Sequence, residues 1–144
     1  MNTSILNIDV QEFINTNLNS NITSIVLKGT SFSSVETNEI VEQIEAKKRC
    51  EKKLPTWFSA ENIYYPNKLN IEQTSSEITA KYKSGLISGN SIIDLTGGFG
   101  VDCFYFSKHF KTVNHCEINE DLSHIVKYNY KQLNIKNIST INAD

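Results

Sequence analysis

The spacing of hydrophobic residues changes about halfway along the chain. In the first half, apolar residues recur every three or four positions over residues 9–18, 33–53 and 75–86, a spacing typical of amphipathic helices. Residues 22–29 form a shorter apolar segment, and its isoleucines and valine fit a helix or a strand. The first half is therefore predicted to be mainly helical.

Capping sequences stand at the start of two of these helices. Ser33-x-x-Glu36 begins the helix that runs to about residue 53, and Thr74-x-x-Glu77 begins the helix of residues 75–86. In the second of these helices an apolar residue returns every four positions. This repeat predicts a row that faces the core: Ile78, Tyr82 and Leu86.

In the second half, short apolar runs alternate with helical patterns. Residues 91–95, 112–118 and 139–144 have the length and composition of buried strands. Residues 100–109 and 120–133 lie between them and have helical spacing. Strand, helix, strand, helix, strand in this order predicts an α/β fold with a parallel sheet and right-handed crossovers.

A glycine-rich loop follows the first predicted strand. Gly97, Gly98 and Gly100 stand where the strand turns into a helix, and their missing side chains allow a ligand to approach the backbone closely. Ligands of open parallel sheets bind at the carboxyl ends of the strands. The loop, Glu117 after the second strand and Asp144 after the third are therefore expected to share one edge of the sheet.

The acidic residues around this loop indicate the charge of the ligand. Asp94 directly precedes the loop, where a carboxylate would repel a pyrophosphate but suits an ammonium or sulfonium group. S-adenosylmethionine carries both of these cations. Cys103 stands where the dinucleotide-binding fingerprint has its third glycine. Glu117 can accept hydrogen bonds from both hydroxyls of a ribose, as the corresponding acid does in dinucleotide-binding folds.

At these residues the chain resembles a known family. Residues 92–107, IIDLTGGFGVDCFYFS, resemble motif I of class I S-adenosylmethionine-dependent methyltransferases. The order D-x-T-x-G-x-G-x-D is most similar to the guanine-N2 methyltransferases of small-subunit rRNA and related bacterial proteins. Residues 54–84 resemble the segment before motif I in bacterial methyltransferases that carry a THUMP-like domain. Together the resemblance covers residues 54–144.

The resemblance implies a role for each site residue. Asp94 would hold the methionine end of the cofactor, and Gly98 and Gly100 would let the cofactor lie over the loop. Glu117 would bind the ribose, and Asp144 would bind the amino group of the adenine. The complete set of expected cofactor-binding residues is Asp94, Thr96, Gly97, Gly98, Gly100, Glu117 and Asp144.

The resemblance also implies a division of the chain and an activity. Residues 1–72 would form a helical N-terminal region, and residues 73–144 would begin a Rossmann-like domain that binds S-adenosyl-L-methionine. Residues 73–77 would fold over the cofactor or the substrate entrance. The intact enzyme would transfer a methyl group to a base of RNA, either rRNA or tRNA.

Part of the pattern expected of the family is missing from these residues. Such enzymes have a seven-stranded sheet and a (D/N)PP(Y/F)-like motif after the fourth strand, whereas residues 1–144 supply about three strands and lack the motif. The chain is therefore expected to be the front part of an enzyme and inactive alone. No catalytic residue is assigned, and the apolar edge of the sheet is expected to be exposed or covered by something else.

Overall charge gives no evidence for a polyanionic partner, but it does not exclude RNA, because a local patch can bind it. The net charge is −2 at pH 7 and the pI is about 5.9, so bulk charge predicts affinity for neither nucleic acid nor an anionic membrane. One basic cluster falls in the helix of residues 33–53. It is either a solvated face or a contact for an RNA backbone: Lys47, Lys48, Arg49, Lys52 and Lys53.

Cysteine usage and hydropathy favour a cytoplasmic protein. The three cysteines are odd in number and form no C-x-x-C pair, so a disulfide framework is not expected. The N-terminus does not resemble a signal peptide, and no segment approaches the roughly 20 apolar residues that cross a bilayer. The three histidines lack the spacing of metal ligands, and no metal site is expected.

The sequence is also compatible with two other functions. A nicotinamide- or flavin-dependent oxidoreductase uses the same sheet, although Asp94 and the missing third glycine count against it. A non-catalytic module would bind a partner through its helical half and keep the α/β half as a cofactor-binding remnant. Trp57, Tyr64 and Tyr65 fit either packing between helices or stacking on bases. Asp102 is expected in the first turn of a helix, where the dipole favours an acid.

Overall fold

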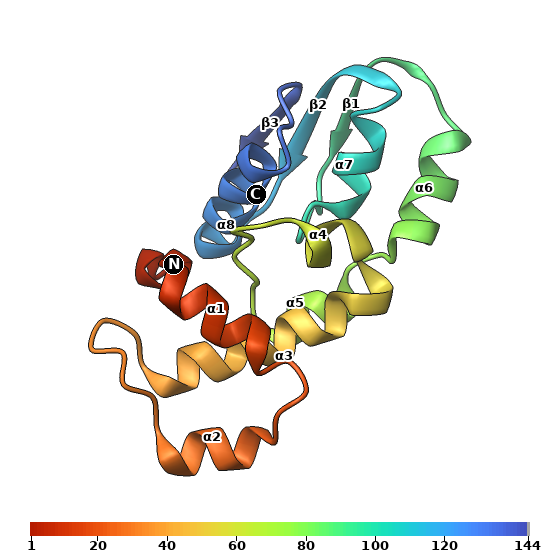
Figure 1. Cartoon of the computed structure of the whole chain (residues 1–144). Helices are drawn as coiled ribbons and strands as arrows, with labels where there is room; N and C mark the ends of the chain where they lie inside the picture. The colour runs from red at the N-terminus through yellow and green to blue at the C-terminus, as the bar shows by residue number, and fades with distance from the viewer. Residues whose placement is uncertain (144) are drawn as a thin grey trace.

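The computed structural model of the chain describes residues 1–143 (Figure 1). Helices of the first half lie below a small sheet in this view, and both chain ends lie on the side of α1 and α8. The elements in chain order are η1 (Thr3–Leu6), α1 (Ile8–Thr16), α2 (Ile22–Lys28), α3 (Thr37–Lys53), α4 (Pro55–Ser59), α5 (Lys68–Gln73), α6 (Glu77–Gly85), β1 (Gly89–Asp94), α7 (Val101–Phe106), β2 (Phe110–Cys116), α8 (Glu120–Gln132) and β3 (Ile138–Ile141).

The sheet has three parallel strands in the order β1-β2-β3, with β2 in the centre. This arrangement confirms the predicted α/β fold with helices first and a parallel sheet after them. The first strand begins two residues earlier than predicted and ends at Asp94, so the glycine loop starts directly at its carboxyl end. The predicted strand of residues 139–144 runs from Ile138 to Ile141, and Asp144 lies outside the described residues.

One face of the sheet is packed and the other is open. Ile92, Val113 and Ile138 lie side by side across the three strands, with Val113 in the hydrophobic core and the two isoleucines partly buried against it. On the opposite face, Ile93 of the edge strand β1 is 53% exposed and Ile141 of the other edge strand is 39% exposed. Within residues 1–143 the sheet therefore has an exposed apolar surface at its β1 edge.

The helical half packs around α3, which contacts α1, α2, α4 and α5. The ambiguous apolar segment is the helix α2, and it ends at Gly29. The predicted capping box at Ser33 is wrong, because α3 begins four residues later. Its N-cap is Glu36, whose side chain pairs with the third helical position, Glu39. The acidic side chains at these two positions satisfy the first backbone N–H groups of α3.

The predicted core face of α6 is wrong. Ile78 is 81% exposed, Tyr82 is 69% exposed and Leu86 is 64% exposed. The buried row of this helix consists of Glu77, Ala80 and Ser84, and α6 packs with this row against α7. Small residues allow the two helices to approach closely, and hydrogen bonds satisfy the buried carboxylate. The N-cap is Ser76 and not Thr74.

Aromatic residues join the helical half to the sheet. Trp57 of α4 is 1% exposed and packs edge-to-face against Phe104 of α7 and at a tilt against Phe99 of the glycine loop. A single hydrophobic cluster thus runs through both halves of the chain. The division of the chain at residue 72 stays a prediction. No helix within residues 1–143 is long and apolar enough to span a membrane.

Candidate functional site

The glycine loop lies across the carboxyl ends of β1 and β2. The backbone N–H of Gly97 donates to the carbonyl of Cys116, the last residue of β2, over 2.8 Å. His115, also on β2 and fully buried, places its Nε2 3.0 Å from the carbonyl oxygen of Gly98. Both contacts fix the loop to the central strand, so its conformation is set by the sheet.

Packing inside the protein explains two of the three glycines. A Cβ at Gly97 would overlap the His115 ring and lie 2.8 Å from its Cγ. A Cβ at Gly100 would overlap Tyr130 of α8, 2.8 Å from its Cζ, and Gly100 also has a φ of +82°. The hydroxyl of Tyr130 donates to the Gly100 carbonyl over 2.9 Å. These two positions lack a side chain because the protein itself occupies the space.

Gly98 differs from its two neighbours. Its φ is +51°, and the nearest atom to an added Cβ would be the carbonyl oxygen of Thr96, at 3.9 Å. The space beside Gly98 is therefore open, and a ligand can approach its backbone there.

Glu117 holds a fixed carboxylate beside this opening. Its Oε2 accepts the backbone N–H of Gly98 over 3.1 Å, and its Oε1 accepts the backbone N–H of Asn119 over 2.8 Å. Each carboxylate oxygen has a second lone pair that can accept another hydrogen bond. The carboxylate is thus held in one orientation while it can still receive two donors from a ligand.

A pocket of about 350 Å³ lies between the glycine loop and the segment that joins α5 to α6. On the sheet side it is lined by four of the predicted residues: Thr96, Gly97, Gly98 and Glu117. The helical side consists of Asn70, Gln73, Thr74 and Ser75, and Phe99, Asp102, Asn119 and Leu122 complete the wall. The pocket therefore brings together two carboxylates, several hydroxyl and amide groups, and few apolar atoms.

Asp94 does not line this pocket. Its Oδ1 accepts the backbone N–H of Thr96 over 3.0 Å, and its Oδ2 accepts the thiol of Cys103 at 3.7 Å. Burial and the nearby Asp94 raise the pKa of that thiol well above its usual range. In this structure Asp94 braces the start of the loop against α7, and its contact with a ligand stays a prediction. Gly100 also lies outside the lining residues.

Asp102 is a pocket residue that sequence reasoning assigned only to the helix dipole. Its Oδ2 accepts the Ser75 hydroxyl over 2.8 Å and the Lys83 ammonium over 2.7 Å. Its Oδ1 is buried and has no hydrogen-bond partner within residues 1–143. The network ties the segment after α5 to α7 across the mouth of the pocket. It also leaves Oδ1 without a hydrogen-bond partner among these residues.

Glu77 stabilises the helical wall of the same pocket. Its buried carboxylate accepts the backbone N–H of Thr56 over 2.6 Å and the Thr56 hydroxyl over 2.8 Å. It also accepts the hydroxyl of Tyr105 over 2.7 Å. Burial and the bond to Glu77 raise the pKa of Tyr105 to about 12. Three helices, α4, α6 and α7, therefore meet at one carboxylate, which holds residues 73–76 close to the loop.

No family model matches the chain, and no curated protein matches it. Among solved structures the chain is similar to a protein of Porphyromonas gingivalis W83 assigned as a methyltransferase. The TM-score is 0.78 and the identity is 26%, over 96% of this chain and 34% of that protein. The chain thus spans about a third of that protein's length.

Two further solved structures align with less than half of the chain. An rRNA methylase from Streptococcus thermophilus has 18% identity over 46% of this chain and 40% of its own, with a TM-score of 0.41. A protein of Streptococcus mutans assigned as a methyltransferase, in complex with SAH, has 29% identity over 46% of this chain and 39% of its own, with a TM-score of 0.40. These two similarities are too weak to support a conclusion about this chain. What the comparisons show is that almost all of this chain has the fold of a protein assigned as a methyltransferase.

Proposed function

We propose that the chain is part of an S-adenosyl-L-methionine-dependent methyltransferase of class I and supplies the part of its cofactor site formed by the glycine loop and Glu117. The observation that carries this proposal is the pair formed by Glu117 and Gly98. A carboxylate held by two backbone N–H groups stands beside Gly98, the glycine of the loop that opens onto free space. A ribose with two neighbouring hydroxyls fits the two free lone pairs of such a carboxylate.

The remaining pocket residues fit the other end of the same cofactor. The methionine part carries an ammonium group, and Asp102 adds a carboxylate to the lining of the pocket. Asp94 lies behind the loop, and its negative charge favours a cation in front of it. The carboxylate of Asp94, directly before the loop, would disfavour the pyrophosphate of a dinucleotide. The pocket therefore suits S-adenosylmethionine better than a nicotinamide or flavin dinucleotide.

The cofactor would supply a methyl group on a sulfonium centre, which an attacking atom of the substrate displaces in line. The residues of this chain would contribute binding and orientation: Glu117 would fix the ribose, and the loop would fix the position of the sulfonium. The substrate proposed is a base of RNA. This part rests on the resemblance of residues 54–107 to RNA methyltransferases.

Isothermal titration of the chain with S-adenosylhomocysteine and with NAD tests the proposal. We expect the first to bind and the second not to bind. Glu117→Ala should weaken binding at least about tenfold, because two ribose hydrogen bonds are lost. Glu120→Ala is the matched control, since this exposed acid lies three residues further and outside the pocket.

Three outcomes would contradict the proposal. Tighter binding of NAD would favour an oxidoreductase, and binding of neither ligand would favour a non-catalytic remnant. Wild-type affinity in Glu117→Ala would show that the assigned site is wrong. Reading the source gene beyond the codon of residue 144 would show whether a (D/N)PP(Y/F)-like motif follows in the same frame.

A further inference from the structure

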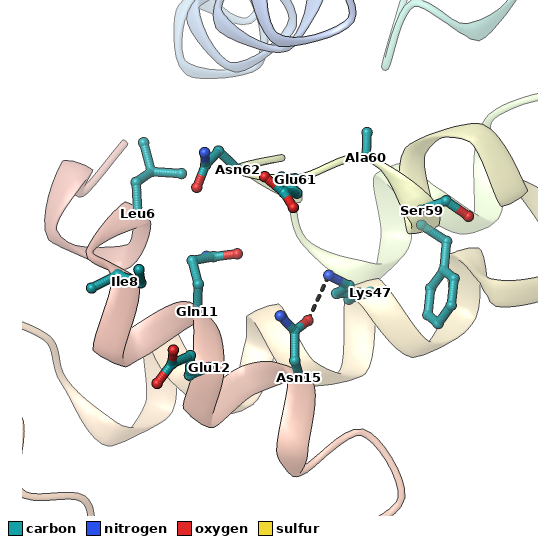
Figure 2. A pocket seen from close by; sticks show the side chains of 11 residues that line it. Leu6, Ile8, Gln11, Glu12, Asn15, Lys47, Ser59, Ala60, Glu61 and Asn62 are labelled. Atoms are coloured by element: carbon teal, nitrogen blue, oxygen red, sulfur yellow. Dashed lines mark hydrogen bonds between the residues drawn. The ribbon is translucent and has the colours of Figure 1, made fainter.

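A second pocket lies in the helical half of the chain, between α1, α3 and the segment that follows α4 (Figure 2). Its volume is about 640 Å³, nearly twice that of the pocket at the glycine loop. The short helix α4 connects the two pockets. Trp57 packs on Phe99, which lines the first pocket, and the next residue, Phe58, lines the second. No role has so far been assigned to this second pocket.

Lys47 of α3 places a buried cation against this pocket. The residue is 7% exposed, and its Nζ donates to Oδ1 of Asn15 over 2.7 Å (Figure 2). No carboxylate of residues 1–143 lies within 4.0 Å of it. Burial lowers the pKa of the Lys47 ammonium. A desolvated ammonium with one neutral partner has two N–H groups left for an anion.

The other basic residues of α3 are mostly engaged within the protein. Lys48 pairs with Glu51 over 2.7 Å, and Arg49 pairs with Glu72 over 2.8 Å. The ammonium of Lys53 donates to two backbone carbonyls of α5. The basic cluster seen in the sequence therefore does not form a continuous patch for a phosphate backbone. Its one buried member without a carboxylate partner is the lysine at the pocket.

Four further groups around the pocket indicate which chemical groups its ligand carries. The ring of Phe58 is partly exposed, and its centroid lies 5.8 Å from Nζ of Lys47. Glu61, on the segment that follows α4, extends a carboxylate toward the same space, and the side-chain amide of Gln11 points into it (Figure 2). Glu12 of α1 lines the pocket as a second carboxylate. A cation, an aromatic ring and carboxylate acceptors in one pocket match a phosphate, a flat base and an amino group.

We propose that this pocket binds one unpaired nucleotide of an RNA strand, with the phosphate at Lys47, the base on Phe58 and the exocyclic amino group of the base at Glu61. The assignment of RNA rests on the function proposed above. Because uracil has no exocyclic amino group, the pocket prefers cytosine, adenine or guanine over uracil. The helical half of the chain then holds a substrate nucleotide while the loop holds the cofactor.

Fluorescence anisotropy with labelled single-stranded octamers of cytidine and of uridine tests this proposal on the whole chain at 0.15 M salt. The cytidine octamer should bind more tightly. Asn15→Asp gives the ammonium of Lys47 an internal carboxylate partner and should weaken binding on the order of tenfold. Asn19→Asp is the matched control, because Asn19 accepts the ammonium of Lys48 over 2.6 Å in the same way but lies outside the pocket.

Two more variants separate the remaining contacts. Phe58→Leu should weaken both octamers by at least about fivefold, since base stacking on an aromatic ring is lost. Glu61→Gln should reduce the preference for cytidine over uridine. Equal effects of Asn15→Asp and Asn19→Asp, or absence of RNA binding by the wild type, would overturn the proposal. Binding of S-adenosylhomocysteine to the same samples tests the cofactor site separately.

Discussion

The glycine loop allows a direct test of which glycines serve the fold and which serves a ligand. Gly98 and Gly100 both have a positive φ, +51° and +82°. Alanine at either position therefore costs roughly 1–2 kcal/mol of backbone strain. The surroundings differ, because a new Cβ meets nothing closer than 3.9 Å at Gly98 but overlaps Tyr130 at Gly100. The difference between the two variants isolates the cost of the overlap.

The expected values follow from these contacts. Gly98→Ala should lower the free energy of unfolding by about 1–2 kcal/mol, from strain alone. Gly100→Ala adds overpacking, about 1–3 kcal/mol, and disturbs the bond from the Tyr130 hydroxyl to the Gly100 carbonyl, about 1 kcal/mol. Its total is then about 3–6 kcal/mol, a large share of the stability of a small domain. Gly98→Ala should nevertheless be the variant that weakens binding of S-adenosylhomocysteine.

Urea unfolding followed by the fluorescence of Trp57 measures these values, because this residue is the only tryptophan and is buried between Phe99 and Phe104. In a Tyr130→Leu background, alanine at position 100 should cost less than in the wild type. If alanine at positions 98 and 100 costs the same within about 0.5 kcal/mol, the packing argument is refuted. Unchanged cofactor binding in Gly98→Ala would refute the assignment of the open side of the loop.

Three other properties can be predicted from the structure. Ile78→Glu should leave the free energy of unfolding in urea almost unchanged, whereas Ala80→Glu on the buried row of α6 should lower it by roughly 3 kcal/mol. Burial raises the pKa of the Cys50 thiol to about 12, so the unfolded chain loses this proton at a lower pH than the folded chain does. Stability should therefore fall between pH 9 and 12, by about 1.4 kcal/mol per pH unit from this group, and Cys50→Ala should show a smaller slope. Glu77→Ala should destabilise the fold by about 3 kcal/mol, and a double-mutant cycle with Tyr105→Phe should show coupling.

The order of elements in the second half could be predicted from the sequence because each signal is local. An apolar run, a glycine-rich turn and a helical repeat lie within a few residues of one another, and the three parallel strands appear close to the predicted positions. The face of α6 could not be predicted in this way. Burial of Glu77 depends on Thr56 and Tyr105, which are 21 and 28 residues away in the chain. No pattern within α6 indicates that these partners exist.

In the candidate site, too, the features set by local sequence could be predicted, and those set by long-range packing could not. The proximity of the loop to Glu117 follows from a general property of parallel sheets, and the structure shows their contact. The position of Asp102 depends on how α6 packs against α7, since Ser75 and Lys83 both donate to it. Conversely, a sequence of three glycines does not show that His115 and Tyr130 fill the space at two of them. Long-range packing decides both questions.

The two walls of the pocket are held by interactions of different strength. On the sheet side, backbone N–H groups of Gly98 and Asn119 fix Glu117. Gly98 belongs to the loop bonded to β2, and Asn119 is the N-cap of α8. A carboxylate held in this way loses little freedom when a ligand binds. On the helical side, Ser75 donates to Asp102, which forms an ion pair with Lys83 of α6, and the lysine side chain is 43% exposed. Such a pair contributes about 1 kcal/mol or less. The sheet side is therefore preorganised for the ligand, and on the helical side the buried Glu77 carboxylate, more than this ion pair, holds the segment between α5 and α6 in place.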